Sequence, residues 1–293
     1  MSVFATINKL FLRVFGLMLS VILIGAIPPS GKTTIEAETP EDLKLQVTVF
    51  SDVHMQSFEY SGYVELAKSL RDAAGSAKPQ DALVLVGDNT MNGQNTEYFM
   101  LYGLLSQYNR AKNTLVAMGN HDLGLKDYTA EESIERHNFF LQSYTGISTD
   151  KTYYAKEING YTFIILGGEG PILETYVSPE QRAFIAETLQ TVEPGKPIFV
   201  FFHQQLYDKE IADMLKEHPN VFLFNGHLHS TLATWDEEGI NRINLPGLHS
   251  HNDDDTGGEG LQIEVYDDQV IMRGRNYMQG EWIDGQRYVY DLA

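Results

Sequence analysis

Short apolar runs alternate with segments of helical spacing along most of the chain. Uninterrupted apolar runs of strand length occupy residues 82–86, 115–118, 198–202 and 221–224, and residues 45–50, which read LQVTVF, also predict a strand. Apolar side chains recur every three to four residues over 64–74, 96–107 and 131–143. Another helix is predicted to start at Ser178-Pro179, where a capping residue precedes a proline. Continuous apolar strands between helices are typical of an α/β fold whose sheet is covered on both faces.

Two further patterns add antiparallel strands to this picture. Residues 152–158 and 161–166 flank the turn Asn159-Gly160 and predict a hairpin. From Thr231 onward the pattern is all-β, with a second hairpin predicted at 266–269. The sequence therefore predicts one α/β domain over residues 38–293, in which two mixed β-sheets pack as a sandwich with helices on the outside.

The first 37 residues differ from the rest in kind. Lys9 and Arg13 precede residues 14–27, which carry no charge, and a polar spacer follows. This order is typical of an export signal, and the apolar stretch is shorter than the roughly 20 residues of a spanning helix. Ala26 and Ala37 are the candidate cleavage positions. We expect an exported protein, either secreted or held by an uncleaved anchor, with a buried N-terminal helix as the alternative.

Composition narrows the chemistry. The chain has no cysteine, which excludes disulfides, thiolate metal sites and a cysteine nucleophile. Its net charge of -19 disfavours nucleic-acid polymers and anionic membrane surfaces, because both require positive counter-charge. Any membrane contact is therefore expected only through the N-terminal segment. A small anionic substrate stays compatible with this charge if bound metal ions reverse the local field.

Polar clusters follow five of the predicted strands directly. They read Ser51-Asp52-Val53-His54, Gly87-Asp88-Asn89, Gly119-Asn120-His121-Asp122, His203-Gln204-Gln205 and Asn225-Gly226-His227-Leu228-His229. In open α/β sheets, ligands bind outside the carboxyl ends of the strands. We therefore expect the five clusters to meet in one crevice.

Carboxylate, amide and imidazole groups dominate these clusters, and they favour metals such as Mn, Fe, Zn or Co. The candidate ligands are Asp52, His54, Asp88, Asn120, His203, His227 and His229. Seven ligands are too many for one ion, whereas two ions that share the Asp88 carboxylate accommodate them. Two such ions lower the pKa of a shared water, and the resulting bridging hydroxide is the predicted nucleophile for phosphate-ester hydrolysis.

These blocks, in this order over residues 52–229, resemble the calcineurin-like metallophosphoesterase family. The resemblance implies a sandwich of two mixed sheets between helical layers. It also implies that Asp52, His54 and His229 hold one divalent ion and that Asn120, His203 and His227 hold the other, with Asp88 shared. His121 would protonate the leaving group as general acid, and Asp122 would orient its imidazole.

Two positions depart from the family pattern. The family often has a proline soon after the fourth-block histidine, where this chain has Gln204-Gln205. The purple acid phosphatase branch has a tyrosine three residues after the shared aspartate, where this chain has Met91. The alternatives to a small phosphate-ester substrate are a nuclease of the same family and a non-catalytic metal-binding scaffold.

The other histidines have weaker predicted roles. His137 and His218 are expected on helix surfaces without function. His249 and His251 follow a late strand, and either a solvated loop or a substrate contact is compatible with their positions.

Overall fold

Two six-stranded sheets lie face to face in the computed structural model, which describes residues 33–124, 128–169, 176–249 and 257–293. The first sheet contains β1 (Leu45–Phe50), β2 (Ala82–Val86), β3 (Asn113–Ala117), β10 (Glu259–Val265), β11 (Gln269–Asn276) and β12 (Glu281–Asp291). The second contains β4 (Tyr154–Ile158), β5 (Tyr161–Ile165), β6 (Ile198–Phe201), β7 (Val221–Asn225), β8 (Ala233–Glu237) and β9 (Ile240–Asn244). The strand orders are β12-β11-β10-β1-β2-β3 and β4-β5-β6-β7-β9-β8.

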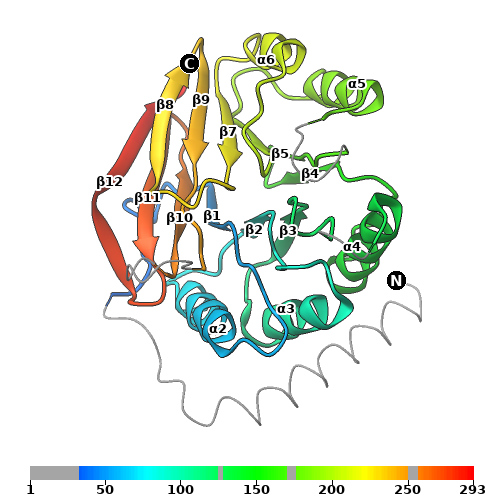
Figure 1. Cartoon of the computed structure of the whole chain (residues 1–293). Helices are drawn as coiled ribbons and strands as arrows, with labels where there is room; N and C mark the ends of the chain where they lie inside the picture. Colours follow the sequence, from blue (N-terminus) through cyan, green and yellow to red (C-terminus); the bar gives the residue numbers. More distant parts are fainter. Residues whose placement is uncertain (1–32, 125–127, 170–175, 250–256) are drawn as a thin grey trace.

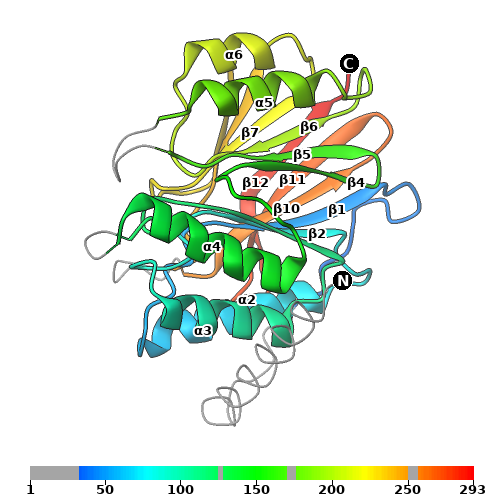
Figure 2. The same ribbon diagram turned by 90° about the vertical axis from the view of Figure 1, so that its right-hand side faces the viewer.

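Helices cover the outer faces of the two sheets. They are α2 (Tyr60–Ala74), α3 (Asn95–Tyr108), α4 (Ala130–Thr145), α5 (Pro179–Leu189) and α6 (Lys209–Leu215). Figures 1 and 2 show α5 and α6 beyond the second sheet, and α2, α3 and α4 on the side of the first sheet. The predicted α/β sandwich of two mixed sheets is confirmed, and each predicted hairpin forms an antiparallel pair.

Alternation along the strands explains why β6 and β7, in the middle of the second sheet, are apolar on both faces. Phe199 and Phe201 on β6 face the first sheet and stack on Phe222 and Phe224 of β7, with ring centroids 5.7 Å and 4.6 Å apart. Val200, between the two β6 phenylalanines, faces the core under α5 and α6 instead. Successive side chains of a strand point to opposite faces, so a strand that is covered on both sides is continuously apolar.

The described domain begins before residue 38. Ile35 is buried in the main core, and Thr33 donates through its hydroxyl to the Gly280 carbonyl at 2.7 Å. The buried Arg275 donates to the Thr33 carbonyl at 2.6 Å and also pairs with Asp72 of α2. Residues 33–37 therefore pack as part of the domain. Residues 1–32 of the expected signal segment, which spans residues 1–37, lie outside the described residues.

No helix among the described residues has the length and apolarity needed to cross a membrane.

The expectation that His137 lies on a helix surface is wrong. It lies inside α4, is 3% exposed, and its ring meets Tyr98 edge-on, because the helix turns this position toward α3. Burial lowers its pKa. His218 is partly exposed in the bend after α6.

Candidate metal centre

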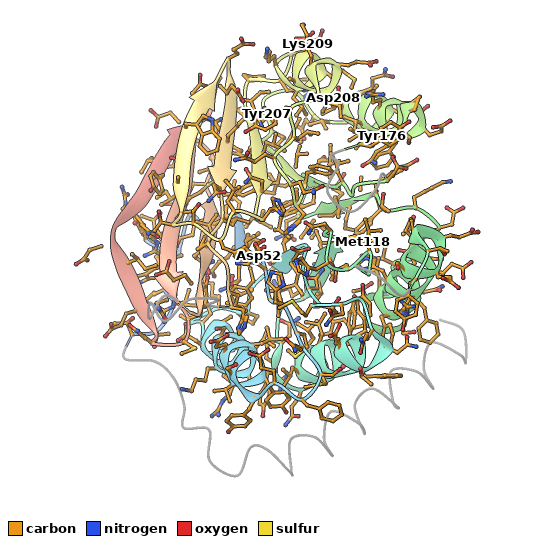
Figure 3. All side chains as sticks on the ribbon, in the orientation of Figure 1. Asp52, Met118, Tyr176, Tyr207, Asp208 and Lys209 are labelled. Atoms are coloured by element: carbon orange, nitrogen blue, oxygen red, sulfur yellow. The ribbon has the colours of Figure 1, made fainter. Side chains whose placement is uncertain are left out.

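The strands that precede the five polar clusters are neighbours in their sheets. β1, β2 and β3 are adjacent and parallel in the first sheet, and β6 and β7 are adjacent and parallel in the second. Their carboxyl ends therefore open toward the same side of the sandwich. In Figure 3, Asp52 and Met118, which directly follow β1 and β3, lie in the interior of the molecule. The clusters at these strand ends therefore meet, as predicted, on one side of the sandwich.

One group of ligand atoms forms around Asp52. The His229 Nε2 atom lies 3.3 Å from Asp52 Oδ1 and 3.1 Å from His54 Nε2. The His54 Nε2 atom lies 3.7 Å from the same Asp52 oxygen. Asp52 and His54 are buried, whereas the His229 side chain is 28% exposed. These are the three residues predicted to hold the first ion, and their ligand atoms all lie within 4.8 Å of one another.

A second group forms around Asp88. The His203 Nε2 atom lies 3.0 Å from Asp88 Oδ2, and His227 completes a set of ligand atoms within 4.8 Å of one another. The Asn120 Oδ1 atom is buried and has no hydrogen-bond partner among the described residues. Asp88 Oδ2 also lies 3.8 Å from His54 Nε2, so this carboxylate reaches toward both groups. Asp88 therefore has the position of a shared ligand.

The two groups fit a pair of divalent ions. Ligand atoms that bind one ion at about 2.0–2.2 Å lie roughly 3 Å apart, which is the spacing seen here. The His203 Nδ1 atom donates to the Val86 carbonyl at 2.7 Å, so the other ring nitrogen faces the Asp88 carboxylate. A neutral imidazole would present a lone pair to a carboxylate oxygen, and a cation between them removes that repulsion. The buried amide oxygen of Asn120, which accepts no hydrogen bond from the described residues, would likewise be satisfied by a bound cation.

The ionisation of the two carboxylates, of His227 and of His229 suits metal binding, whereas His203 is held in its protonated form until an ion binds. Burial disfavours the His203 imidazolium, but the charges of Asp88 and Asp52 outweigh burial and raise the His203 pKa to about 10. Burial opposes ionisation of Asp52 and Asp88 as well, yet the positive charge of His203 holds the pKa of both below its usual range. Burial lowers the pKa of His227 and His229. Ionised carboxylates and neutral imidazoles are the forms that ligate metals, so an ion that binds beside Asp88 would displace the proton of His203.

Most of these ligands have a left-handed backbone. Positive φ angles occur at Asp52 (53°), His54 (45°), Asp88 (46°), His227 (70°) and His229 (48°). For a residue other than glycine this conformation costs on the order of 1–2 kcal/mol, and such strain clusters at functional sites. The strand β7 ends at Asn225, so strand alternation does not direct His227 and His229. The left-handed conformation instead lets both side chains, two residues apart, turn toward the centre.

Glycines let the strand ends approach one another closely. A Cβ atom on Gly226 would lie 1.9 Å from Ser51 Oγ, and one on Gly119 would lie 2.1 Å from the Asp88 backbone nitrogen. Both distances are far below any real contact, so a side chain at either position would push apart the loops that carry the ligands. The Ser51 hydroxyl in turn donates to Asp52 Oδ2 at 2.6 Å.

Comparison with known families agrees with this centre. The model of the calcineurin-like phosphoesterases matches residues 45–231, which is well over half of the chain and includes every predicted ligand. The chain belongs to the calcineurin-like phosphoesterase family. The predicted family resemblance is thereby confirmed, and membership in this family of binuclear metal enzymes accounts for the two ligand groups.

Solved phosphatase structures share the fold of this phosphoesterase. A purple acid phosphatase from yellow lupin (Lupinus luteus) seeds superposes with a TM-score of 0.64 at 11% identity, over 84% of this chain and 53% of that chain. A dimetal phosphatase from Danio rerio superposes with a TM-score of 0.62 at 14% identity, over 86% of this chain and 100% of that chain. This chain thus corresponds to about half of the lupin enzyme. No protein with a curated description matches it.

His121 lies beside the ligands of this phosphoesterase. Its ring meets the His54 ring edge-on with centroids 4.7 Å apart, and its backbone nitrogen donates to Asp88 Oδ1 at 2.8 Å. The His121 Nδ1 atom donates to the Met91 carbonyl at 2.8 Å. That bond leaves Nε2 as the nitrogen that is free to act on a substrate.

The predicted role of Asp122 is wrong in one respect, because Asp122 does not orient the His121 imidazole. Its buried carboxylate accepts from Asn89 and Thr90, each through backbone and side chain, and from the Gly119 nitrogen. The Tyr98 hydroxyl donates to it at 3.4 Å. Asp122 therefore fastens the loop after β2 to the loop after β3. The sequence places Asp122 next to His121 but does not reveal that Met91 supplies the orienting carbonyl.

His249 is buried, so the expectation of a solvated loop is wrong at this residue. It is 7% exposed, and its Nδ1 atom lies 2.5 Å from Glu65 Oε2 on α2. Its backbone nitrogen donates to the Asp52 carbonyl at 3.1 Å. The loop after β9 is therefore tied to both α2 and the metal centre. His251 lies outside the described residues.

Proposed function

We propose that this phosphoesterase hydrolyses small phosphate esters at a centre of two divalent ions. The observation that carries the proposal is the meeting of two ligand groups at the Asp88 carboxylate, which lies 3.0 Å from His203 Nε2 and 3.8 Å from His54 Nε2. When bound, the two ions supply an activated water and a positive clamp for the phosphoryl oxygens.

His121 supplies a proton to the leaving-group oxygen in this proposal. The Met91 carbonyl fixes the ring through Nδ1, so that Nε2 carries the transferred proton. The edge-on contact with His54 keeps the ring beside the ligand groups. Asp122 acts at one remove, because it holds together the two loops that carry Asp88 and His121.

The charge of the chain supports a small substrate. A centre of two divalent ions and two carboxylates keeps a positive charge inside a chain of net charge -19. The centre attracts one phosphate group, while the surrounding negative charge repels a long polyanion. We therefore favour small esters over nucleic-acid polymers.

A metal and activity survey tests this function. The full-length chain is stripped and reloaded with Mn, Fe, Zn or Co, and its metal content is measured. It is then assayed on bis-nitrophenyl phosphate, nitrophenyl phosphate, a cyclic nucleotide and long DNA. Two ions per chain with turnover of a small ester support the proposal. Two ions without turnover on any substrate indicate the scaffold, and a preference for long DNA indicates the nuclease.

We also propose that the protein is exported. The support is the basic start at Lys9 and Arg13 ahead of the uncharged residues 14–27. Residues 33–37 pack into the domain, so cleavage after Ala37 would remove the buried Ile35, and cleavage after Ala26 would not. Mass spectrometry of the protein from the extracytoplasmic fraction should find Ile27 as the first residue, or Met1 if the segment is retained as an anchor. Recovery only from the cytoplasm would contradict export.

A further inference from the structure

Phe58 is the most exposed large apolar side chain in the described residues. It is 98% exposed, and its φ of 67° places it in the left-handed region. An aromatic ring in water and a left-handed backbone at a residue other than glycine are both unfavourable. At this exposure the ring has almost no contact with the rest of the described chain, so internal packing does not offset either cost.

The backbone around Phe58 is fastened on both sides. The Ser57 hydroxyl lies 2.5 Å from the Thr96 hydroxyl at the start of α3. The Glu59 carboxylate lies 3.6 Å from His249 Nε2, and the Glu59 nitrogen donates to the Gln56 carbonyl. These contacts hold the left-handed turn in place. The contacts of Ser57 and Glu59 therefore hold the loop between β1 and α2 in a conformation that keeps the Phe58 ring exposed.

Hydrogen bonds also connect the loop that carries Phe58 to the segment beside His121. Phe58 follows the ligand His54 by four residues. The Met91 nitrogen donates to the Met55 carbonyl at 3.0 Å, and the Met91 carbonyl accepts from His121 Nδ1. The loop that carries Phe58 is thus bonded to the segment that orients the proposed general acid, where the leaving group of a substrate would lie.

Leu228 lies on a second loop of the metal centre, the one that follows β7. It stands between the ligands His227 and His229 and is 47% exposed. The His229 and His54 Nε2 atoms are 3.1 Å apart, so the loops that carry Leu228 and Phe58 meet at the centre. We call Phe58 and Leu228 the rim of the metal centre. Exposure alone does not assign a residue to the rim, since Tyr207 is 71% exposed and lies toward α6, away from Asp52 (Figure 3).

We propose that Phe58, together with Leu228, contacts the organic group of the substrate, so that the preferred esters carry an apolar or aromatic alcohol. This inference rests on the proposed function. With the phosphate held at the metal centre, the alcohol projects past His121 toward the rim. Covering the Phe58 ring and the Leu228 side chain removes apolar surface from water, and an aromatic alcohol gains further from ring contact.

A binding experiment tests the rim without requiring turnover. Phenylphosphonate and methylphosphonate carry the same anionic group and are not hydrolysed as esters. Calorimetry on the metal-loaded full-length chain should show tighter binding of phenylphosphonate. Phe58→Ala should weaken phenylphosphonate about fivefold to tenfold, which corresponds to the loss of one aromatic contact, and should leave methylphosphonate unchanged. Phe58→Tyr should keep the preference, and Leu228→Ala should reduce it about twofold to fivefold.

Phe139→Ala is the matched control, because Phe139 is 48% exposed on α4 and carries no predicted role in the centre. The phenyl-to-methyl ratio of this variant should equal that of the unmodified chain. A ratio that is unchanged in both Phe58→Ala and Leu228→Ala would overturn the rim. Hydrolysis of benzyl and ethyl phosphate then separates the two proposals: an intact binding preference without any hydrolysis contradicts the proposed function and keeps the rim, whereas hydrolysis without a benzyl preference contradicts the rim alone.

Discussion

The two sides of the metal centre are built differently. The first sheet contributes Asp52, His54, Asp88 and Asn120, all of which are at most 5% exposed. The second sheet contributes three imidazoles, of which His203 is buried, His227 partly exposed and His229 exposed. Among the ligands, negative charge is therefore confined to the first-sheet side, and the two least buried side chains, His227 and His229, belong to the second.

The supporting contacts follow the same division. On the first-sheet side, Asp122 accepts hydrogen bonds from the loops after β2 and β3, and Ser51 donates to Asp52. On the second-sheet side, the His227 backbone nitrogen donates to the Asp52 carboxylate at 3.1 Å, so the loop after β7 is held by a residue of the first-sheet side. This difference indicates that the first-sheet loops hold the ligands in place through their hydrogen bonds, and that the second-sheet loops add the remaining imidazole ligands.

The shared ligand should give the largest effect. Asp88→Ala removes the carboxylate that lies near both His203 and His54. We expect fewer than one tightly bound ion per chain and a fall in kcat/KM of about 10³-fold or more, because both ions lose a ligand. Metal analysis and nitrophenyl ester assays measure the two quantities. Asp284→Ala, at an exposed position on β12, is the control and should change neither. Retention of two ions by Asp88→Ala would show that the carboxylate is not shared.

The proposed general acid should give the next largest effect. His121→Ala should keep both ions and lower kcat by about 10²-fold to 10⁴-fold. The loss should be greatest for alkyl esters, because a poor leaving group needs the proton most. His218→Ala, which alters a partly exposed histidine after α6, should leave the rates unchanged. Equal losses on nitrophenyl and alkyl esters would argue against proton donation by His121.

Asp122 should affect stability more than chemistry. Asp122→Asn turns an NH₂ group toward donors from Asn89, Thr90 or Gly119 and leaves buried donors unpaired. We expect a loss of about 3–5 kcal/mol in the free energy of unfolding, since each unpaired buried donor costs about 1–3 kcal/mol. Urea titration with Asp284→Asn as control measures this loss. A variant with unchanged stability and a loss of kcat alone would restore the direct catalytic role.

His229 should be the most dispensable ligand. It is the most exposed of the set, and Asp52 and His54 remain to hold the ion on that side. His229→Ala should weaken one ion by about 10-fold to 100-fold, should leave the other in place, and should not change the melting temperature of the metal-free chain. Metal titration by calorimetry resolves the two affinities. Loss of both ions together would show that the two sides of the centre are not separable in this way.

The sequence predicts the fold and the ligands well for one reason. Apolar runs that end in Asp, Asn or His specify both the strands and the residues at their carboxyl ends, as at Asp52 and Asp88. The structure brings six of the predicted ligands, all except Asn120, into groups of ligand atoms that lie within 4.8 Å of one another. Asn120 has a buried amide oxygen without a hydrogen-bond partner among the described residues, and its role as a ligand stays a prediction.

The remaining features depend on contacts between distant segments. Spacing places Asp122 beside His121 but does not reveal that its partners are Asn89 and Thr90 on another loop. The left-handed backbone at the ligands and the burial of His137 also follow from tertiary packing. The Thr33 and Arg275 contact extends the domain toward the N-terminus for the same reason, since its partners lie far apart in the sequence.

The number of metal ions per chain tests the central claim most directly. The full-length chain, stripped and reloaded with Mn, should bind two ions, and electron paramagnetic resonance should show a magnetically coupled pair, because both ions bind the Asp88 carboxylate. A single ion per chain, or two uncoupled ions, would contradict a centre built around a shared Asp88.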